Sequence, residues 1–186
     1  MQDIEDELIK RAALGSTEAF EGILKGCGDF VFNVSLRMVR NRQDAEEVSQ
    51  EVFLLIFRKL KEFQWRASFK TWVYRITVNT ALNYIKRVAG MKDRSVEYNE
   101  DLHSTAQPGE VPAVAEKEYA QGVVDRLLGE LTAEQRACIV LRNVEGLTYE
   151  EIAGALGIDI NSVRSRLKRA REKMLSIKKE VMADEL

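Results

Sequence analysis

The chain has 186 residues, a net charge of −2 and a hydrophobic fraction of 45%, which fits one large or two small globular domains. Its longest apolar run, residues 52–57, is too short to cross a bilayer, and its start is acidic where a signal peptide would be basic. We therefore expect a cytoplasmic protein without membrane insertion.

The cysteines, Cys27 and Cys138, lie far apart and the chain has one histidine, so we expect reduced core thiols, no metal site and no cofactor. The sequence contains no glycine-rich phosphate-binding loop and no nucleophile–base pair, so nothing in it indicates an enzyme.

The first forty residues are predicted to form three short helices. Apolar residues recur at helical spacing in three segments. The first is residues 3–14, the second begins after Ser16, which would cap it, and the third is residues 30–39. Gly26 and Gly28 are expected to loosen the end of the second helix. We expect these helices to supply core residues only.

A longer helix is predicted to begin at Asp44, which would form a capping box with Glu47. Its inward stripe contains Val48, Val52, Leu55 and Ile56. The rest of the 52–57 segment is apolar as well, which is unusual for a helix with one face exposed to solvent. The pattern leaves two alternatives: this is the central helix of a bundle, or one of its sides docks on a partner.

The next helix follows the loop KEFQWRAS and is predicted to be capped by Ser68. One arc should face the core: Val73, Thr77, Ala81, Tyr84 and Val88. The opposite arc combines an aromatic ring with amides and cations: Trp72, Arg75, Asn79, Asn83 and Lys86. Such groups stack on an exposed base, bond its edge and hold the phosphates of a single strand. The alternative is that Trp72 is a half-buried core residue beside solvated polar neighbours.

Residues 94–118 are predicted to link two domains, over residues 1–93 and 119–186. The apolar periodicity fades in this stretch, which carries both prolines and has two basic and six acidic residues. The C-terminal domain should begin with a helix near Tyr119. A second helix, capped by Thr132 with Gln135 and ended by Gly146, follows. Four of its residues are expected to be buried: Ala137, Cys138, Leu141 and Val144.

The last two predicted helices form a helix-turn-helix. Thr148 and Glu151 make a capping box, Gly157 permits a sharp turn, and Asn161 is expected to cap the final helix. One narrow arc of that helix is apolar: Val163, Leu167, Ala170 and Met174. Residues 164–179 contain eight Lys or Arg and one acid, a pattern that fits the DNA major groove. A solvated helix at the end of a bundle is the alternative, and the capped helix and turn glycine before it favour DNA binding.

With both halves in view, the sequence resembles bacterial sigma factors of the extracytoplasmic-function (ECF) group, within the primary sigma family. In the first half, the resemblance lies in DAEEVSQEVFLLIFRKLKEF and SFKTWVYRITVNTALNYIKR. In the second half, it lies in LTAEQRACIVLRNVEGLTYEEIAGALGIDINSVRSRLKRAREKM. The linker is too short for the intervening domain of the longer sigma factors. One departure is Trp65, which stands where many relatives have a small or polar residue.

The resemblance implies an all-α fold of two small helical domains and three sets of contact residues. Contacts to the clamp helices of the largest polymerase subunit are implied for Asp44, Glu47, Gln50, Glu51 and Phe53. Contacts to the −10 element are implied for Phe63, Trp65, Arg66, Ser68, Trp72, Arg75, Asn79, Asn83 and Lys86. Contacts to the −35 element are implied for Arg142, Ser162, Arg164, Ser165, Arg166, Lys168, Arg169 and Arg171.

The same resemblance implies that the C-terminal domain rests on the flap of the second-largest subunit, that the linker threads toward the polymerase cleft and RNA exit path, and that an anti-sigma factor holds the protein inactive. We therefore expect a sigma factor that binds core RNA polymerase, recognises −35 and −10 elements and aids promoter melting. A chain with a net charge of −2 gains little DNA affinity from its overall electrostatic field. Binding to polymerase would supply the remaining affinity for DNA. The alternatives are a stand-alone helix-turn-helix regulator that binds duplex DNA as a dimer, and a helical adaptor that binds only proteins.

Overall fold

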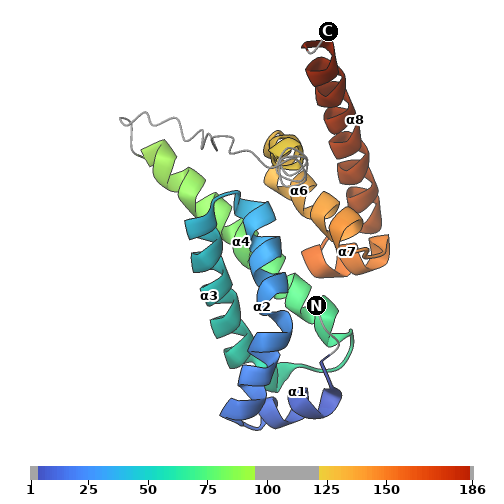
Figure 1. The fold of residues 1–186 in the computed structure, drawn as a ribbon. Helices are drawn as coiled ribbons and strands as arrows, with labels where there is room; N and C mark the ends of the chain where they lie inside the picture. Colours follow the sequence, from blue (N-terminus) through green and yellow to red (C-terminus); the bar gives the residue numbers. More distant parts are fainter. Residues whose placement is uncertain (1–3, 95–121, 185–186) are drawn as a thin grey trace, which may run out of the picture.

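The computed structural model describes residues 4–94 and 122–184, and within these ranges the chain forms helices joined by turns (Figure 1). The N-terminal bundle contains α1 (Asp6–Ala13), α2 (Thr17–Val39), α3 (Arg42–Lys59), the short 3-10 helix η1 (Leu60–Glu62) and α4 (Phe69–Arg94). The C-terminal bundle contains a helix over residues 122–129, α6 (Ala133–Ile139), the π-helix η2 (Val140–Val144), α7 (Tyr149–Leu156) and α8 (Ile160–Asp184). The predicted all-α fold with two helical domains is confirmed. Residues 95–118 of the predicted linker, and Tyr119, lie outside the described residues.

Three long helices, α2, α3 and α4, pack against one another and enclose the core of the N-terminal bundle. Each carries an apolar stripe that this packing removes from water. The fully buried side chains include Ile23, Val31, Val34, Met38, Val48, Val52, Ile56 and Val73. Burial of one such side chain contributes roughly 1.5–3 kcal/mol. The predicted inward arc of α4 is confirmed up to Tyr84, and Val88 is half-buried. Across both described ranges, no helix is long and apolar enough to span a membrane.

The second and third predicted helices are one continuous helix, α2, so the predicted break near Gly26 and Gly28 is wrong. A glycine inside a helix costs about 1 kcal/mol relative to alanine, and burial of the surrounding apolar stripe outweighs that cost. Gly26 also permits a close contact, because a Cβ atom there would lie 3.0 Å from the Ile4 side chain. The segment before α1 can therefore rest directly on α2.

The start of α3 differs from the predicted capping box of Asp44 and Glu47. The helix begins earlier, and its cap is Asn41, the side chain of which accepts a hydrogen bond from the Asp44 N–H at 3.0 Å. The Asp44 carboxylate is instead bonded by the Tyr84 hydroxyl of α4 at 2.8 Å. Burial, with a further contribution from that bond, raises the pKa of Tyr84 to about 12. Asp44 therefore ties α3 to α4.

The caps of the C-terminal bundle match the sequence in two of three cases. Both predicted capping boxes, at Thr132 and at Thr148, are present with reciprocal hydrogen bonds. Gly157 has a φ of 65°, the left-handed conformation that ends α7 and starts the turn. The predicted cap of the last helix at Asn161 is wrong, because α8 already begins at Ile160.

The second helix of this bundle changes from α-helix to the π-helix η2 after Ile139. Hydrogen bonds in a π-helix span one more residue than in an α-helix, so the following side chains rotate away from their expected positions. Val144, which was predicted to be buried, is accordingly 45% exposed. The other three residues predicted to be buried here are buried, and Gly146 follows the end of the helix with a φ of 74°.

Cys27 and Cys138 are free thiols and lie fully buried in the core, as expected. The Cys27 thiol donates a hydrogen bond to the Ile23 carbonyl at 3.0 Å. Burial raises the pKa of each thiol to about 11. Neither residue therefore forms a reactive thiolate near neutral pH.

Asp159 gives the start of α8 a pH-dependent contribution to stability. Its carboxylate accepts hydrogen bonds from the Ser162 hydroxyl and from the backbone N–H groups of Ser162 and Asn161. These bonds favour the charged form and lower the pKa of Asp159. Because the pKa is lower in the folded chain than in the unfolded chain, the stabilisation is present above the ordinary aspartate pKa and is lost as the pH falls through the lowered folded value.

We therefore expect the wild-type protein to be more stable than Asp159→Asn at neutral pH, and this advantage to vanish in acid. Asparagine is also a good helix cap, so the substitution removes mainly the charge. Urea unfolding midpoints measured from neutral pH down to about pH 3 would test this, since that range brackets the ordinary aspartate pKa. A difference between the two proteins that stays constant over the range would contradict the assignment.

Candidate nucleic-acid and polymerase interfaces

The loop between η1 and α4 is built on a cluster of aromatic rings. The Phe63 ring lies at its centre, with centroid distances of 4.9 Å to Trp65, 5.2 Å to Trp72 and 5.6 Å to Phe69. Phe63 is buried and Trp72 is half-buried, so both support the loop from beneath. Trp65 is exposed, and its φ of 57° is a left-handed conformation that costs a non-glycine residue roughly 1–2 kcal/mol. Packing on Phe63 holds it there.

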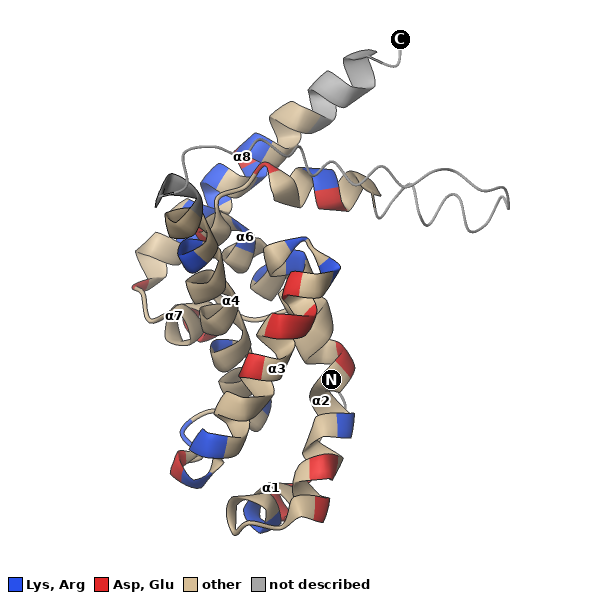
Figure 2. Ribbon diagram, turned by 90° about the vertical axis from the view of Figure 1, so that its left-hand side faces the viewer, with Lys and Arg blue, Asp and Glu red and all other residues tan. Residues whose placement is uncertain are grey.

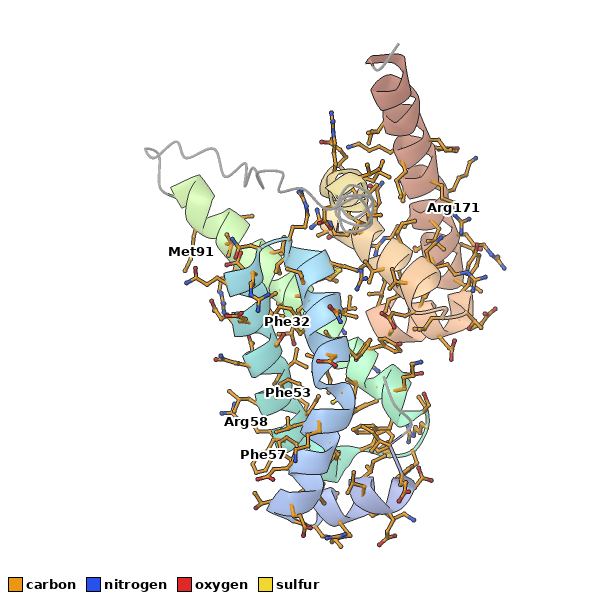
Figure 3. The ribbon with its side chains drawn as sticks, viewed as in Figure 1. Phe32, Phe53, Phe57, Arg58, Met91 and Arg171 are labelled. Atoms are coloured by element: carbon orange, nitrogen blue, oxygen red, sulfur yellow. The ribbon has the colours of Figure 1, made fainter. Side chains whose placement is uncertain are left out.

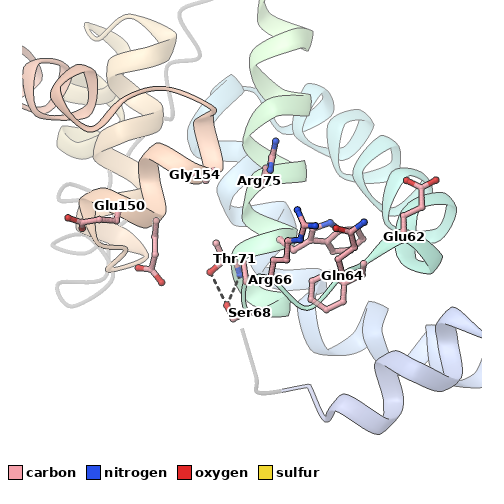
Figure 4. A pocket seen from close by; sticks show the side chains of 13 residues that line it. Glu62, Gln64, Arg66, Ser68, Thr71, Arg75, Glu150 and Gly154 are labelled. Atoms are coloured by element: carbon pink, nitrogen blue, oxygen red, sulfur yellow. Dashed lines mark hydrogen bonds between the residues drawn. The ribbon is translucent and has the colours of Figure 1, made fainter.

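A cleft of about 640 Å³ lies between this loop and the first turns of α7. Figure 4 shows Arg66, Ser68 and Arg75 on one side of it, and Glu150 and Gly154 on the other. The cleft brings together five of the residues predicted to contact the −10 element: Phe63, Arg66, Ser68, Trp72 and Arg75. The Ser68 hydroxyl accepts the Thr71 N–H at 3.1 Å and so caps α4, as predicted. Cations beside aromatic surface suit a nucleotide strand.

The other residues predicted to contact the −10 element lie outside this cleft. Asn83 and Lys86 are exposed farther along α4. Trp65 lines a second cleft of about 530 Å³ near α1, where the Lys10 ammonium lies 5.8 Å from its ring centroid. Asn79 is half-buried, and its side-chain amide donates a hydrogen bond to the Ala155 carbonyl of α7 at 3.1 Å.

The residues predicted to contact the −35 element divide into an exposed set and an occupied set. The exposed set is Arg164, Ser165, Lys168, Arg169 and Arg171. Three of these have partners on α8 itself: Arg164 bonds Asn161, Ser165 bonds the Ser162 carbonyl, and Lys168 pairs with Glu172. Figure 2 shows basic residues along α8, and Figure 3 places Arg171 on the side of α8 that faces away from the N-terminal bundle. The arc behind them is buried at Val163, Leu167 and Ala170, as predicted, and Met174, the fourth residue of that arc, is half-buried.

The occupied set consists of Arg142, Ser162 and Arg166. Arg142 donates to the Leu147 carbonyl at 2.8 Å and stacks over the Tyr149 ring at 5.3 Å. Ser162 bonds the Asp159 carboxylate, and Arg166 is half-buried beside the Cys138 thiol. These side chains are engaged inside the protein, so the surface open to a duplex is narrower than the sequence predicted.

The outer face of α3 carries exposed apolar side chains among polar ones. The Tyr84 hydroxyl donates to the Asp44 carboxylate at 2.8 Å and to the Glu47 carboxylate at 3.4 Å, and the Arg87 guanidinium donates to Glu47 at 2.9 Å. Glu47 is nevertheless exposed, as are Gln50 and Glu51, and Asp44 and Phe53 are half-buried. Leu54 and Phe57, which the predicted set omitted, are 55% and 58% exposed. The sequence already indicated Leu54 and Phe57, because residues 52–57 are all apolar and a helix over them is apolar on nearly every side. Figure 3 shows Phe53 and Phe57 along this helix.

Two family models match the chain. The model for "Sigma-70 region 2" matches residues 23–90, and the model for "Sigma-70, region 4" matches residues 121–174. "RNA polymerase sigma-H factor" of Pseudomonas aeruginosa is 30% identical over 177 residues, which is 92% of each chain. "ECF RNA polymerase sigma-E factor" of Escherichia coli is 32% identical over 174 residues, which is 89% of each chain.

Two solved structures share the fold. The structure of CnrH in complex with the cytosolic domain of CnrY aligns with a TM-score of 0.68 at 23% identity, over 96% of this chain and 99% of that one. The sigma factor RpoE of Bartonella quintana, in complex with the anti-sigma factor NepR, aligns with a TM-score of 0.68 at 23% identity, over 88% and 98%.

The first family match spans the aromatic loop and the α3 face, and the second spans the helix-turn-helix. Neither the family models nor these relatives support the alternative of a stand-alone dimeric regulator. The chain therefore belongs to the sigma-70 family, and it is an RNA polymerase sigma factor that acts in promoter-specific initiation of transcription.

Proposed function

We propose that the chain is a sigma factor of the ECF group, in which residues 1–93 bind core polymerase and the −10 element, residues 94–118 form a linker, and residues 119–186 bind the −35 element. The observation that carries this division is the presence of two unlike surfaces on two bundles. One is the aromatic and cationic side that the N-terminal bundle gives to the cleft, and the other is an exposed basic helix of the C-terminal bundle. The group assignment is supported by the name of the Escherichia coli relative, which matches over 89% of its length.

The N-terminal side of the cleft, together with the adjoining stripe of α4, is the proposed site for the non-template strand of the −10 element. An extruded base loses stacking worth a few kcal/mol, and contact with an aromatic ring offsets part of that loss. The loop from Trp65 to Ser68 would cover the base, and Asn79 would bond its edge. Arg66 and Arg75 supply positive charge for the phosphates, and Trp72 supports the loop.

The exposed side of α8 is the proposed reader of the −35 element. An arginine can donate two hydrogen bonds to a guanine edge in the major groove, and lysine and serine can contact phosphates. Because the net charge of the chain is −2, this surface alone should bind bare DNA weakly. Attachment to polymerase would supply the remaining affinity.

Arg169→Ala is expected to lower transcription about tenfold from promoters that depend on a −35 element, since one good base contact is worth about 1–3 kcal/mol. Run-off transcription by the reconstituted holoenzyme measures this, on templates with an intact or a scrambled −35 element. The defect should disappear on the scrambled template. The matched control is Lys25→Ala, which removes an exposed cation from α2. Equal activity of Arg169→Ala and wild type on the intact template would mean that Arg169 is only solvated.

The outer face of α3 is the proposed contact with the clamp helices of the largest polymerase subunit. Gln50, Glu51 and Phe53 from the predicted set lie there, and Leu54 and Phe57 extend the apolar area. The C-terminal bundle would rest on the flap of the second-largest subunit, with the linker directed toward the polymerase cleft and RNA exit path.

An anti-sigma factor is the proposed regulator, and the cytoplasm, where polymerase works, is the proposed location. One relative of the same fold was solved together with an anti-sigma factor. We expect neither a cofactor nor catalytic activity of the chain itself.

Run-off transcription with purified core polymerase tests the proposed function directly. The protein should direct initiation from defined sites, and mapping these sites across a genome should reveal common −35 and −10 sequences. Failure to bind core polymerase at modest salt would contradict the proposal.

A further inference from the structure

The loop that follows η1 divides its side chains between two clefts. Gln64 and Arg66 line the first cleft, where Figure 4 shows both of them. Trp65, which lies between them in the sequence, lines the second cleft, near α1. Trp65 also carries the left-handed φ of 57°, at the start of the bend over residues 65–67. Its ring therefore lies in a different cleft from the groups proposed to meet the −10 element.

Two groups hold the Trp65 indole in the second cleft. The centroid of the Phe63 ring lies 4.9 Å from the centroid of the indole, and the Lys10 ammonium lies 5.8 Å from the same ring centroid. A cation within about 6 Å of an aromatic centroid is attracted by the negative face of the ring, and tryptophan is the strongest partner for such a contact. Trp65 thus joins the loop to α1 as well as to its own aromatic cluster.

The helix that carries Lys10 is firmly seated on its neighbours. A Cβ atom at Gly22 of α2 would lie 3.0 Å from the Leu8 side chain, so this glycine allows α1 to approach α2 closely. Ile9 is 1% exposed, and α1 also packs on η1. Because Lys10 directly follows Ile9, the core fixes the backbone from which the ammonium reaches the indole.

The family match assigns no role to α1. The model for sigma-70 region 2 begins at residue 23, whereas α1 ends at Ala13. The contact with α1 depends on the residue by which this loop departs from many relatives, since a small side chain at position 65 could not reach Lys10. The link between α1 and the loop is therefore a feature that the tryptophan gives to this chain.

We propose that Trp65 is an anchor rather than a base contact, and that Lys10 is a positioning residue for recognition of the −10 element. Held between Lys10 and Phe63, the indole fixes the bend over residues 65–67, and the bend directs Gln64 and Arg66 into the first cleft. This inference rests on the proposed assignment of that cleft to the −10 element. An amide can bond a base edge and a guanidinium can bond a phosphate, so a fixed bend presents both groups to the strand without further ordering.

Lys10→Met tests the anchor, because methionine keeps an apolar side chain and removes the charge. Run-off transcription by the reconstituted holoenzyme compares a template that has an intact −10 element with one in which that element is scrambled. We expect the preference for the intact template to fall about two- to fivefold, the effect of losing one exposed cation–π contact. Lys10→Arg should restore the preference, since a guanidinium also stacks on an aromatic face.

Lys61→Met is the matched control. Lys61 is exposed and lines the same cleft as Lys10, and we expect this variant to behave as wild type. Equal losses in Lys61→Met and Lys10→Met would overturn the anchor, because they would mean that the second cleft binds the strand through its cations. In the Trp65→Ala background, Lys10→Met should cause no further loss, since Lys10 acts only through the indole. Additive losses would mean that Lys10 contacts DNA by itself.

Fluorine NMR of the free protein reports the anchor without DNA. The chain has two tryptophans, so incorporation of 5-fluorotryptophan gives two signals, and Trp65→Phe identifies the signal of Trp65. That signal should shift in Lys10→Met and keep its position in Lys61→Met. An unshifted signal in Lys10→Met, or a preference for the intact −10 element equal to that of wild type, would overturn the inference. A wild-type holoenzyme that transcribes the intact and scrambled templates equally would instead contradict the proposed function.

Discussion

Replacement of both Leu54 and Phe57 by aspartate is expected to weaken binding to core RNA polymerase by at least about a hundredfold. Apolar and aromatic side chains at the centre of an interface commonly contribute 2 kcal/mol or more each, and an unpaired carboxylate buried in their place adds a further penalty. Both side chains are more than half exposed, and the Phe57 ring also packs edge-on against Phe20 of α2 at 5.0 Å. Unfolding of the double variant is therefore measured beside its binding. The neighbouring Gln50 and Glu51 are exposed as well, which makes this face a continuous candidate contact.

The double substitution has a matched control in Leu14→Asp. Leu14 follows α1 and is 88% exposed, so it tests the effect of adding a carboxylate to exposed apolar surface elsewhere. Co-elution with core polymerase and a titration of binding affinity would compare the proteins, with urea unfolding as a check on folding. Unchanged affinity of the double variant would assign the apolar surface of α3 to a partner other than the polymerase.

Asn79→Ala is expected to reduce initiation from promoters with a −10 element by about 10- to 100-fold, since an amide that bonds a base edge contributes roughly 1–3 kcal/mol. Binding to core polymerase should be unaffected, because Asn79 lies on α4 and the proposed polymerase contact lies on α3. Run-off transcription and a core-binding titration, performed on the same protein samples, measure the two effects separately.

The control for this prediction is Asn33→Ala, which removes an exposed amide from α2, outside the proposed surfaces. Loss of core binding by Asn79→Ala would show that the polar stripe of α4 has been given the wrong role.

Several features that depend on neighbours within two helical turns followed from the sequence, but the predicted caps at Asp44 and Asn161 did not. The capping boxes at Thr132 and Thr148 and the turn at Gly157 need only residues a few positions apart, and all three are present. The buried arc of α8 follows from helical spacing in the same way. In contrast, the continuity of α2 through Gly26 depends on its packing partners, including Ile4, which local propensity does not contain.

The candidate site shows the same division. Helical spacing placed aromatic, amide and basic groups on one arc of α4, and it placed cations on the open side of α8. It could not tell which of those groups are occupied inside the protein. Asn79 of α4 donates to the Ala155 carbonyl, and Arg166 of α8 is half-buried beside the Cys138 thiol, because the fold brings these partners to them.

The sequence by itself determined two helical bundles, a basic final helix and a polar stripe beside an aromatic loop, because each is encoded in the periodicity of a short segment. Only the tertiary structure decided that the stripe faces α7. Asn79 and Ala155 are 76 positions apart, and their contact depends on how two separately encoded bundles pack. No local pattern specifies that arrangement, because it is the sum of weak contacts along the whole boundary between them.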